Sequence, residues 1–259
     1  MSMRELLQER YGKGHLSYSS IKHALGDMRK WEMYMRGELK KESTALNFGS
    51  LYDCMLLTPD EFDSRYMILH EEDVLAACSK ETRSKSRPTT TKEYGQVVAM
   101  LTEDSGKEVV KASDHKEALL MIERLGNEGL IDQYLTGGKA QVEFNVDVHD
   151  VPLRGFLDYL HDDYILDSKT VGRESSKFKW DVQSWSYDIQ AYIYMQVFPR
   201  DEFLWLIQEK SAPFYPGVVT CTQQTLFNGE MKFEEALDNI KAWLSTDPSE
   251  QTGHGRFSV

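Results

Sequence analysis

The spacing of hydrophobic residues changes near residue 140, from a helical period to a strand period. Before that point, apolar residues recur every three to four positions and predict helices over residues 15–25, 47–62, 91–104 and 113–127. The expected caps are Ser17 or Ser19 for the first helix and Ser113 or Asp114 for the last, while Pro59 ends the second. Residues 79–92 are rich in Ser, Thr, Arg and Pro and predict a loop. The first half is therefore predicted to be mostly helical.

After residue 140, apolar and polar residues alternate, as in a strand with one buried face. The pattern predicts strands over residues 140–148, 151–160, 163–171, 202–210 and 216–224, and helices over 184–198 and 227–246. The order β-β-β-α-β-β-α predicts an α/β fold with a mixed central sheet flanked by helices. We find no strong linker and expect one domain over 1–259, with a largely helical part over 1–138 and a catalytic core over 139–259.

Composition excludes several classes of site. No apolar run approaches the length of about 20 residues that a membrane span needs, and the N-terminus lacks a signal peptide pattern. The three cysteines, Cys54, Cys78 and Cys221, are scattered and show no CxxC spacing. This argues against a disulfide framework, a zinc knuckle or an iron–sulfur cluster, and favours the cytoplasm.

Charge gives two opposing indications about nucleic acid as a partner. The net charge of −12 argues against it, because phosphate binding usually leaves a basic surface. Two stretches, 22–41 and 80–92, are nevertheless rich in Lys and Arg. Either stretch taken alone is equally compatible with an ordinary solvated surface.

The sequence FLDYLHDDYILDSKT, residues 156–170, predicts a hairpin that brings acidic residues together. With Asp162 and Asp163 as a two-residue loop, paired positions sum to 325 and Asp158 lies opposite Asp167. A three-residue loop would leave the two acids diagonal and still within reach of one another. Lys169 is two residues from Asp167 and shares its face of the strand. Like charges directly opposite destabilise a sheet, so such a pair usually has a cation or a reaction to justify it.

Two carboxylates, with Glu143 on the neighbouring strand as a possible third, form an oxygen-rich site without His or Cys. Such a site suits Mg²⁺, or Mn²⁺ as a substitute, better than zinc. A lysine beside the metal can orient the attacking water or neutralise developing charge. Acid, acid and lysine around a metal would serve phosphodiester hydrolysis. The D-x-K tripeptide alone is far more often a surface ion pair.

The wider context makes this motif more specific. The run GFLDYL…YILDSKT…FKWDVQSWSYDIQAYIY resembles the PD-(D/E)XK nuclease superfamily, and most closely the phage-type exonucleases related to RecE (exodeoxyribonuclease VIII). Lambda exonuclease and the RecB nuclease domain are more distant relatives. In that pattern an acid ends one strand, D-x-K-T ends the next, and a helix carries Y-x-x-Q-x-x-x-Y, here Tyr187, Gln190 and Tyr194. The looser flanking similarity extends to LSYSSIKHAL, LNFGSLYDCMLLTPDEF, SRPTTTKEYGQ and the last predicted helix.

The resemblance implies a restriction-endonuclease-like core and a set of residue roles. Asp158 and Asp167 would ligate Mg²⁺, with the backbone carbonyl of Ser168 as a further ligand and Glu143 as a possible one. Lys169 would handle the water nucleophile, and Gln190 would hold a carboxylate or a phosphate. Where many relatives place a histidine in the second helix, this chain has Asp53, a possible ligand and equally a plain helical acid.

The remaining candidates are residues that would touch DNA. Ser17 and Ser19 could contact a phosphate, although capping is the competing use for at least one of them. Tyr187 could contact DNA or belong to the core, and Tyr194 is expected in the core. Contacts to the duplex backbone, which would be salt-dependent and indifferent to sequence, are expected from Arg83, Lys85, Arg87, Lys92, Lys177 and Lys179.

These features predict a Mg²⁺-dependent exonuclease that digests linear duplex DNA from the 5′ end, in phage-type recombination or repair in a bacterial or phage-infected cell. A ring-shaped homo-oligomer and a single-strand annealing partner are implied by the resemblance alone. A single-strand nuclease of the RecB or Cas4 type is the alternative among enzymes, and the cysteine cluster of Cas4 is absent. A catalytically inactive DNA-binding scaffold is the alternative outside enzymes, against which the intact Asp158, Asp167 and Lys169 argue.

Overall fold

The computed structural model describes residues 1–39, 44–103 and 105–246, which form two compact units. The sheet unit comprises Met1–Glu42, Gly137–Ile207 and Gly217–Val259, and the helical unit comprises Ser43–Thr136 and Gln208–Pro216. Helices before residue 40 thus belong with the central sheet rather than with the rest of the N-terminal half. The predicted single domain over 1–259 stays a prediction.

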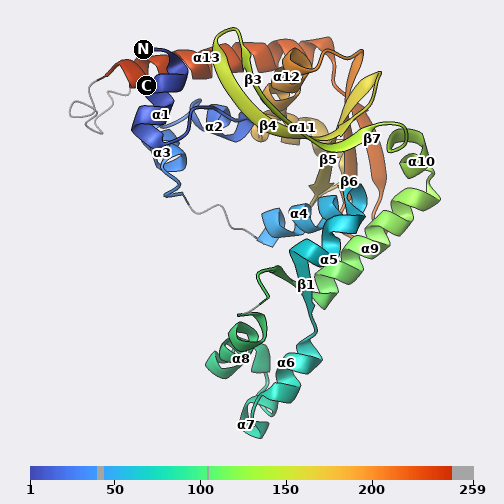
Figure 1. Ribbon diagram of the computed structural model, residues 1–259. Helices are drawn as coiled ribbons and strands as arrows, with labels where there is room; N and C mark the ends of the chain where they lie inside the picture. The colour runs from blue at the N-terminus through green and yellow to red at the C-terminus, as the bar shows by residue number, and fades with distance from the viewer. Residues whose placement is uncertain (40–43, 104, 247–259) are drawn as a thin grey trace. The chain divides into compact units, whose positions relative to one another are not determined.

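The sheet unit contains five strands in the order β3-β4-β5-β6-β7 (Figure 1). Their bounds are Lys139–Val148 for β3, Val151–Leu160 for β4, Tyr164–Val171 for β5, Glu202–Glu209 for β6 and Pro216–Thr220 for β7. The predicted strands are all present.

The directions of the strands follow from their backbone hydrogen bonds. β3 pairs antiparallel with β4, and β4 antiparallel with β5. The amide of Asp201 donates to the carbonyl of Asp163, which places the start of β6 beside the start of β5. The amide of Cys221, just after β7, donates to the carbonyl of Phe203 near the start of β6, so β7 runs antiparallel to β6. The sheet is therefore mixed, as the sequence predicted.

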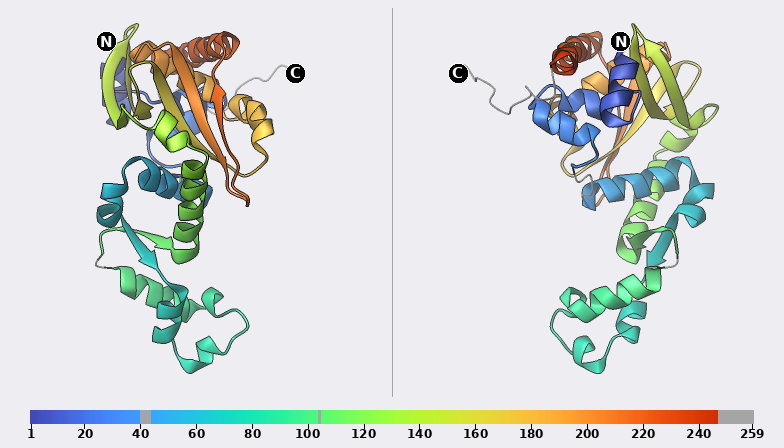
Figure 2. Two further views of the ribbon diagram at one scale, coloured as in Figure 1. Left: turned by 90° about the vertical axis from the view of Figure 1, so that its right-hand side faces the viewer. Right: turned by 60° about the vertical axis from the view of Figure 1, so that its left-hand side comes forward.

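Helices from before, between and after the strands pack against the sheet (Figures 1 and 2). They are α1 (Met3–Tyr11), α2 (Tyr18–His23), α3 (Met28–Met35), α11 (Phe178–Ser184), α12 (Tyr187–Val197) and α13 (Gln223–Ser245), with the short 3-10 helix η3 (Ser175–Lys177). One continuous core unites them with the strands, and Leu16, Trp31, Leu157 and Ile189 are fully buried in it.

The longest helix, α13, lies closely against α12. Gly229 permits this approach, because a Cβ at that position would collide with the backbone carbonyl of Asp188. Lys232 of α13 pairs with the buried carboxylate of Asp188 at 2.6 Å. The contact fixes α12, which carries Gln190, relative to α13.

The helical unit is built from short helices and one small sheet. Its elements are α4 (Thr44–Leu57), η1 (Pro59–Glu61), α5 (Phe62–Arg65), β1 (Tyr66–Leu69), α6 (Glu71–Ala77), α7 (Lys80–Arg83), η2 (Pro88–Thr90), α8 (Lys92–Thr102), β2 (Glu108–Lys111), α9 (Ala112–Asn127) and α10 (Leu130–Tyr134). Among its described residues, apolar clusters lie around Tyr52, Cys54 and Val74. Position 104, the last residue of one predicted helix, lies outside the described residues.

Four local predictions are corrected by the structure. β1 and β2 form a parallel two-stranded sheet at residues for which no strand was predicted, since each strand has just four residues and too few positions to show alternation. Residues 79–92 contain α7 and η2 as well as loop, because Ser79 caps a short helix. Ser113 and Asp114 lie inside the first turn of α9, whose N-cap is Lys111. The predicted helix over 184–198 begins only at Tyr187, after a separate α11.

Candidate active site

The β4–β5 hairpin has the tight turn that the sequence predicted. The amide of His161 donates to the carbonyl of Tyr164 at 2.9 Å, which makes Asp162 and Asp163 the two-residue loop. Tyr159 then pairs with Leu166 and Leu160 with Ile165, and both pairs sum to 325. The register predicted for the hairpin is confirmed at these two pairs.

Beyond Leu166, a side chain of β4 accepts a hydrogen bond from a backbone amide of β5. The amide of Ser168 donates to Oδ2 of Asp158 at 2.8 Å. Gln141 on β3, in a backbone conformation with φ of +49°, approaches the other carboxylate oxygen at 3.5 Å. The Asp158 side chain therefore lies at the gap between β4 and β5, which is where the backbone pairing after Leu166 gives way to the contact with Ser168.

Asp167 is only 1% exposed and is contacted from two directions. The Nζ atom of Lys169 lies 2.5 Å from its Oδ2. The Nε2 atom of Gln190, from α12, donates to its Oδ1 at 2.8 Å. The structure thus brings Asp158, Asp167, Lys169 and Gln190 together at one place, and the hydrogen bond expected of Gln190 is present.

The charges of this cluster do not balance. Burial raises the pKa of Asp167 above its ordinary value; Lys169 lowers it, and the neighbouring Asp158 raises it again. Burial lowers the pKa of Lys169, but the carboxylates of Asp167 and Asp158 together raise it above its ordinary value. The lysine stays charged, whereas one carboxylate of the pair tends to hold a proton. Two acids share one resident cation.

The donor set fits a hard divalent cation. Oδ2 of Asp167 is buried and accepts no hydrogen bond of regular geometry from the described residues, although Lys169 is ion-paired to it. The carbonyl of Ser168, the third oxygen expected in the set, accepts from Lys169 Nζ at 3.3 Å. All three are oxygen donors, which Mg²⁺ and Mn²⁺ prefer. A cation here would also relieve the repulsion between the two acids.

Glu143 is not brought to this pair. Its Oε1 accepts from Nε of Arg154 at 2.8 Å, in an ion pair that is about half exposed. Over residues 1–39, 44–103 and 105–246, no group of three or more His, Cys, Asp and Glu side chains is placed to hold a metal ion. The acidic pair and the Ser168 carbonyl therefore remain as the candidate metal ligands.

Aromatic side chains surround Lys169. Its Nζ lies 5.0 Å from the centre of the Tyr187 ring, which stacks on Phe178. Tyr194 is buried in the core, as predicted, and its hydroxyl donates to the carbonyl of Phe156 at 2.9 Å. Burial raises the pKa of both tyrosines, so both remain neutral hydroxyls. The two tyrosines and Gln190 lie one turn apart on α12 and face the acidic pair together.

The first predicted helix contributes to this neighbourhood through residues that the sequence did not single out. Ser17 caps α2 by accepting from the amide of Ser20, which confirms the capping interpretation for that serine, while Ser19 lies within the helix. Tyr18 donates its hydroxyl to the carbonyl of Trp185, just before α12. Lys22, one turn further along α2, lies over the Tyr18 ring at 5.2 Å. The i, i+4 spacing of Tyr18 and Lys22 was the available signal.

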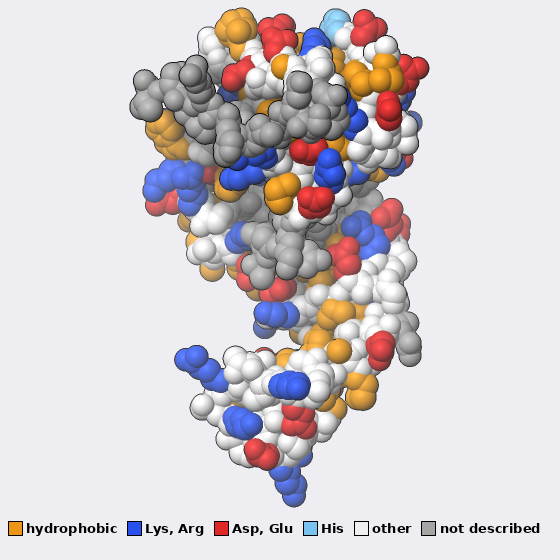
Figure 3. All heavy atoms as spheres, turned by 90° about the vertical axis from the view of Figure 1, so that its left-hand side faces the viewer, with side chains coloured by type: hydrophobic (Ala, Val, Ile, Leu, Met, Phe, Trp, Pro, Cys, Tyr) orange, Lys and Arg blue, Asp and Glu red, His pale blue; other side chains and the backbone are white. Residues whose placement is uncertain are grey.

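The other candidates are divided between the two units. Asp53 lies on α4, in the helical unit. The helical unit also carries Arg83, Lys85, Arg87 and Lys92, from α7 to the start of α8, in the region with exposed basic side chains low in Figure 3. In the sheet unit, Lys177 pairs with Glu174 and Lys179 lies over the ring of Trp180. Contacts of these residues with DNA stay predictions.

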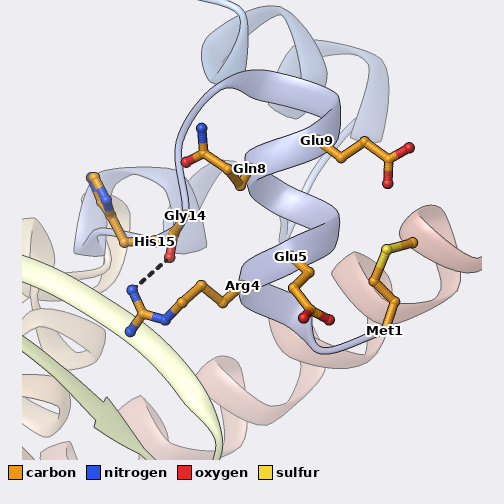
Figure 4. Close-up of a pocket in the computed structure, with 7 residues that line it drawn as sticks. All are labelled: Met1, Arg4, Glu5, Gln8, Glu9, Gly14 and His15. Carbon is orange, nitrogen blue, oxygen red and sulfur yellow. Dashed lines mark hydrogen bonds between the residues drawn. The ribbon is translucent and has the colours of Figure 1, made fainter.

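A shallow pocket lies elsewhere on the sheet unit, along α1 (Figure 4). Its lining includes Arg4, Glu5, Glu9 and His15, and Arg4 donates to the carbonyl of Gly14 at 3.1 Å. None of the residues of the acidic pair lines it. Within the described residues, no helix is long and apolar enough to cross a membrane.

A family model and solved structures resemble this chain. Residues 17–254 match the model of a family described as a PDDEXK-like domain of unknown function. The chain is similar to the crystal structure of a "Putative exonuclease" from Eubacterium rectale, with a TM-score of 0.60, 16% identity, and coverage of 93% of this chain and 84% of that one. An alkaline exonuclease from Laribacter hongkongensis matches with a TM-score of 0.29 and 12% identity, over 72% of this chain and 94% of that one. None of the curated proteins compared with the chain matches it.

Proposed function

The chain belongs to the PDDEXK-like domain family that matches residues 17–254, and from this membership we propose that it is a metal-dependent nuclease acting on DNA. The observation that carries the proposal is the cluster of Asp158, Asp167, Lys169 and Gln190 at the gap between β4 and β5. The resemblance of the D-x-K and Y-x-x-Q motifs to exonucleases of phage type supports the same reaction class.

Asp158, Asp167 and the Ser168 carbonyl would hold Mg²⁺, or Mn²⁺ in its place. When bound, the ion would lower the pKa of a water molecule and stabilise negative charge on a phosphate oxygen. Lys169 keeps its proton beside the two carboxylates and would place its ammonium against the attacking water or the developing charge. Gln190, on α12, donates a hydrogen bond to the Asp167 carboxylate and so fixes its orientation relative to Asp158.

Exonuclease action on linear duplex DNA from the 5′ end, in phage-type recombination or repair, is the finer proposal. It is supported by the resemblance of the central motifs to RecE-type exonucleases and by basic residues in α7 and α8 that could bind backbone phosphates. The resemblance also supports a ring-shaped homo-oligomer, a single-strand annealing partner and a place in the cytoplasm of a bacterial or phage-infected cell.

A cleavage assay on matched substrates tests the proposal. Purified protein is incubated with linear duplex DNA labelled at either the 5′ or the 3′ end, with single strands, and with closed circles, in Mg²⁺, in Mn²⁺ and in EDTA. We expect loss of linear duplex that depends on the metal, with early release of the 5′ label. Attack on closed circles would remove the exonuclease proposal, and preference for single strands would favour a RecB-like activity.

The scaffold alternative has its own signature in the same experiment. A protein that binds the labelled duplex but cleaves nothing with either metal would be an inactive DNA-binding relative. The Asp167→Asn variant is the matched control for wild-type cleavage, because it removes the charge of the buried acid and keeps its volume. Residual cleavage that is equal in wild type and variant would identify a contaminating nuclease.

A further inference from the structure

Lys22 is a half-buried lysine on α2, a helix that contacts α12. No ion pair joins it to any described carboxylate, whereas Lys169 and Lys232 are each paired with a buried aspartate. Its ammonium instead lies over the face of the Tyr18 ring, at 5.2 Å from the ring centre. A ring face stabilises a cation but does not neutralise its positive charge, so the ammonium of Lys22 can still pair with an anion.

The position of Lys22 is fixed by the elements around it. Tyr18 is tied to the turn before α12 by the hydrogen bond from its hydroxyl to the Trp185 carbonyl, at 2.7 Å. The end of α2 is tied to α13, because Asn239 donates to the carbonyl of Ala24 at 2.9 Å. α2 therefore presents Lys22 from a fixed place rather than from a loose surface segment.

Lys22 and Lys169 belong to the same electrostatic neighbourhood. Burial lowers the pKa of Lys22, and the positive charge of Lys169 lowers it further. The positive charge of Lys169 also lowers the pKa of Tyr18, the residue whose ring lies under Lys22, although burial raises that pKa more. Lys22 on α2 lies over the Tyr18 ring, and Lys169 lies over the ring of Tyr187 on α12, a helix that contacts α2. Lys169 is ion-paired with Asp167, whereas Lys22 is ion-paired with no described carboxylate.

We propose that Lys22 binds a backbone phosphate of the DNA strand being cut, next to the phosphate that lies at the acidic pair. The inference rests on the proposed nuclease function and adds a substrate-binding residue to it. A phosphate diester supplies the missing negative charge at short range, and Tyr18 holds the ammonium in place for it. Lys22 would set the position of the strand, while Lys169 acts at the reacting phosphate.

The test compares Lys22→Met with Lys30→Met, which alters an exposed lysine of the neighbouring helix α3. Cleavage of a linear duplex is measured at saturating Mg²⁺ over a series of KCl concentrations. For Lys22→Met we expect KM to rise about 5- to 20-fold with kcat changed less than about threefold. The slope of log KM against log KCl concentration should fall by about one, the value of one lost phosphate contact. Lys30→Met should behave as wild type, and Lys22→Arg should recover most of the loss.

Three results would overturn the proposal. They are an unchanged KM and salt slope in Lys22→Met, a loss confined to kcat, and a lowered Tm that Lys22→Arg restores without restoring KM. The last would show that Lys22 only covers the Tyr18 ring. Failure of the nuclease proposal is distinguishable, because wild-type protein would then cleave nothing. In that case fluorescence anisotropy of a labelled duplex still decides whether Lys22→Met weakens binding relative to Lys30→Met.

Discussion

Two buried Asp–Lys pairs in the sheet unit have nearly the same geometry and different surroundings. Asp188 and Lys232 join α12 to α13 at 2.6 Å, and Asp167 and Lys169 lie two residues apart on β5 at 2.5 Å. Both aspartates are almost fully buried, at 2% and 1% exposed. Asp188 also accepts from the amide of Ile189, so its charge is satisfied by local partners. The first pair has one acid for one base.

The second pair has an additional acid. Asp158 lies beside Asp167 and raises its pKa, in addition to the effect of burial. A buried ion pair with complete partners serves to hold two helices together, and breaking it leaves an unpaired buried charge. A pair with a surplus carboxylate has an unmet requirement for positive charge. The number of charges, and not the distance, distinguishes the structural pair from the candidate functional one.

The largest expected effect comes from neutralising the two aspartates in turn. Asp167→Asn should reduce cleavage by at least about a thousandfold, since the several kcal/mol that a metal ion contributes to the transition state depend on this ligand. Asp188→Asn should leave cleavage within about threefold at 20 °C and lower the Tm, because it disturbs only the α12–α13 contact. Steady-state cleavage and thermal melts of both variants check this. Equal loss of activity in the two variants would contradict the division.

Removal of the two lysines should give the second largest difference. Lys169→Met should slow cleavage by about 10²- to 10⁴-fold, the usual contribution of a positioned proton-transfer or charge-stabilising group. Lys232→Met should instead destabilise the protein, by less than the roughly 3–5 kcal/mol of a fully buried pair, because Lys232 is 30% exposed. Single-turnover cleavage and denaturant unfolding measure the two effects. A fully active Lys169→Met protein would refute the role given to that lysine.

Loss of the Gln190 hydrogen bond should have a smaller effect. Gln190→Leu keeps the volume in the core but removes the donor to Asp167 Oδ1. Groups that orient a metal ligand typically change metal affinity or activity by about 10- to 100-fold. We expect the concentration of Mn²⁺ that gives half-maximal cleavage to rise by that factor. Gln196→Leu, an exposed change on the same helix, is the control and should leave it unaltered.

The smallest expected effect is on the pH dependence of stability. The pKa of Asp167 is raised in the folded protein, so its contribution to stability is complete at acid pH and is lost as pH rises toward the folded pKa, about 7. Metal-free wild type should therefore lose Tm relative to Asp167→Asn between pH 5 and pH 8. Mn²⁺ should raise the wild-type Tm more at pH 8 than at pH 6, because protons compete with the ion. Thermal melts with and without EDTA check both differences.

The sequence was sufficient for the hairpin and its acids because their signals are local. Alternation, a two-residue acidic turn and the D-x-K spacing give the register, and Tyr159 pairs with Leu166 as expected. The Y-x-x-Q spacing places Gln190 on the face of α12 that meets Asp167. The hairpin register needs only a strand period and a turn, whereas the role of Gln190 was implied by the resemblance of its helix motif to the nuclease superfamily.

Contacts between distant segments were beyond the sequence. The position of α2 beside α12 depends on Tyr18 reaching Trp185, across more than 160 residues of chain, and no local pattern encodes it. Glu143 has strand spacing that suits a ligand, but Arg154 on the adjacent strand takes its carboxylate. The parallel pairing of β1 with β2 links segments about 40 residues apart, each too short to show a period. Tertiary packing decided all three.

Calorimetric titration with Mn²⁺ tests the surplus charge at the acidic pair most directly. At pH 7.5, wild-type protein should bind the ion with release of protons, detected by repeating the titration in buffers of different ionisation enthalpy. Asp167→Asn should bind at least about tenfold more weakly, while Asp188→Asn should bind as wild type does. Equal Mn²⁺ affinity in wild type and Asp167→Asn would contradict the assignment of the metal to Asp158 and Asp167.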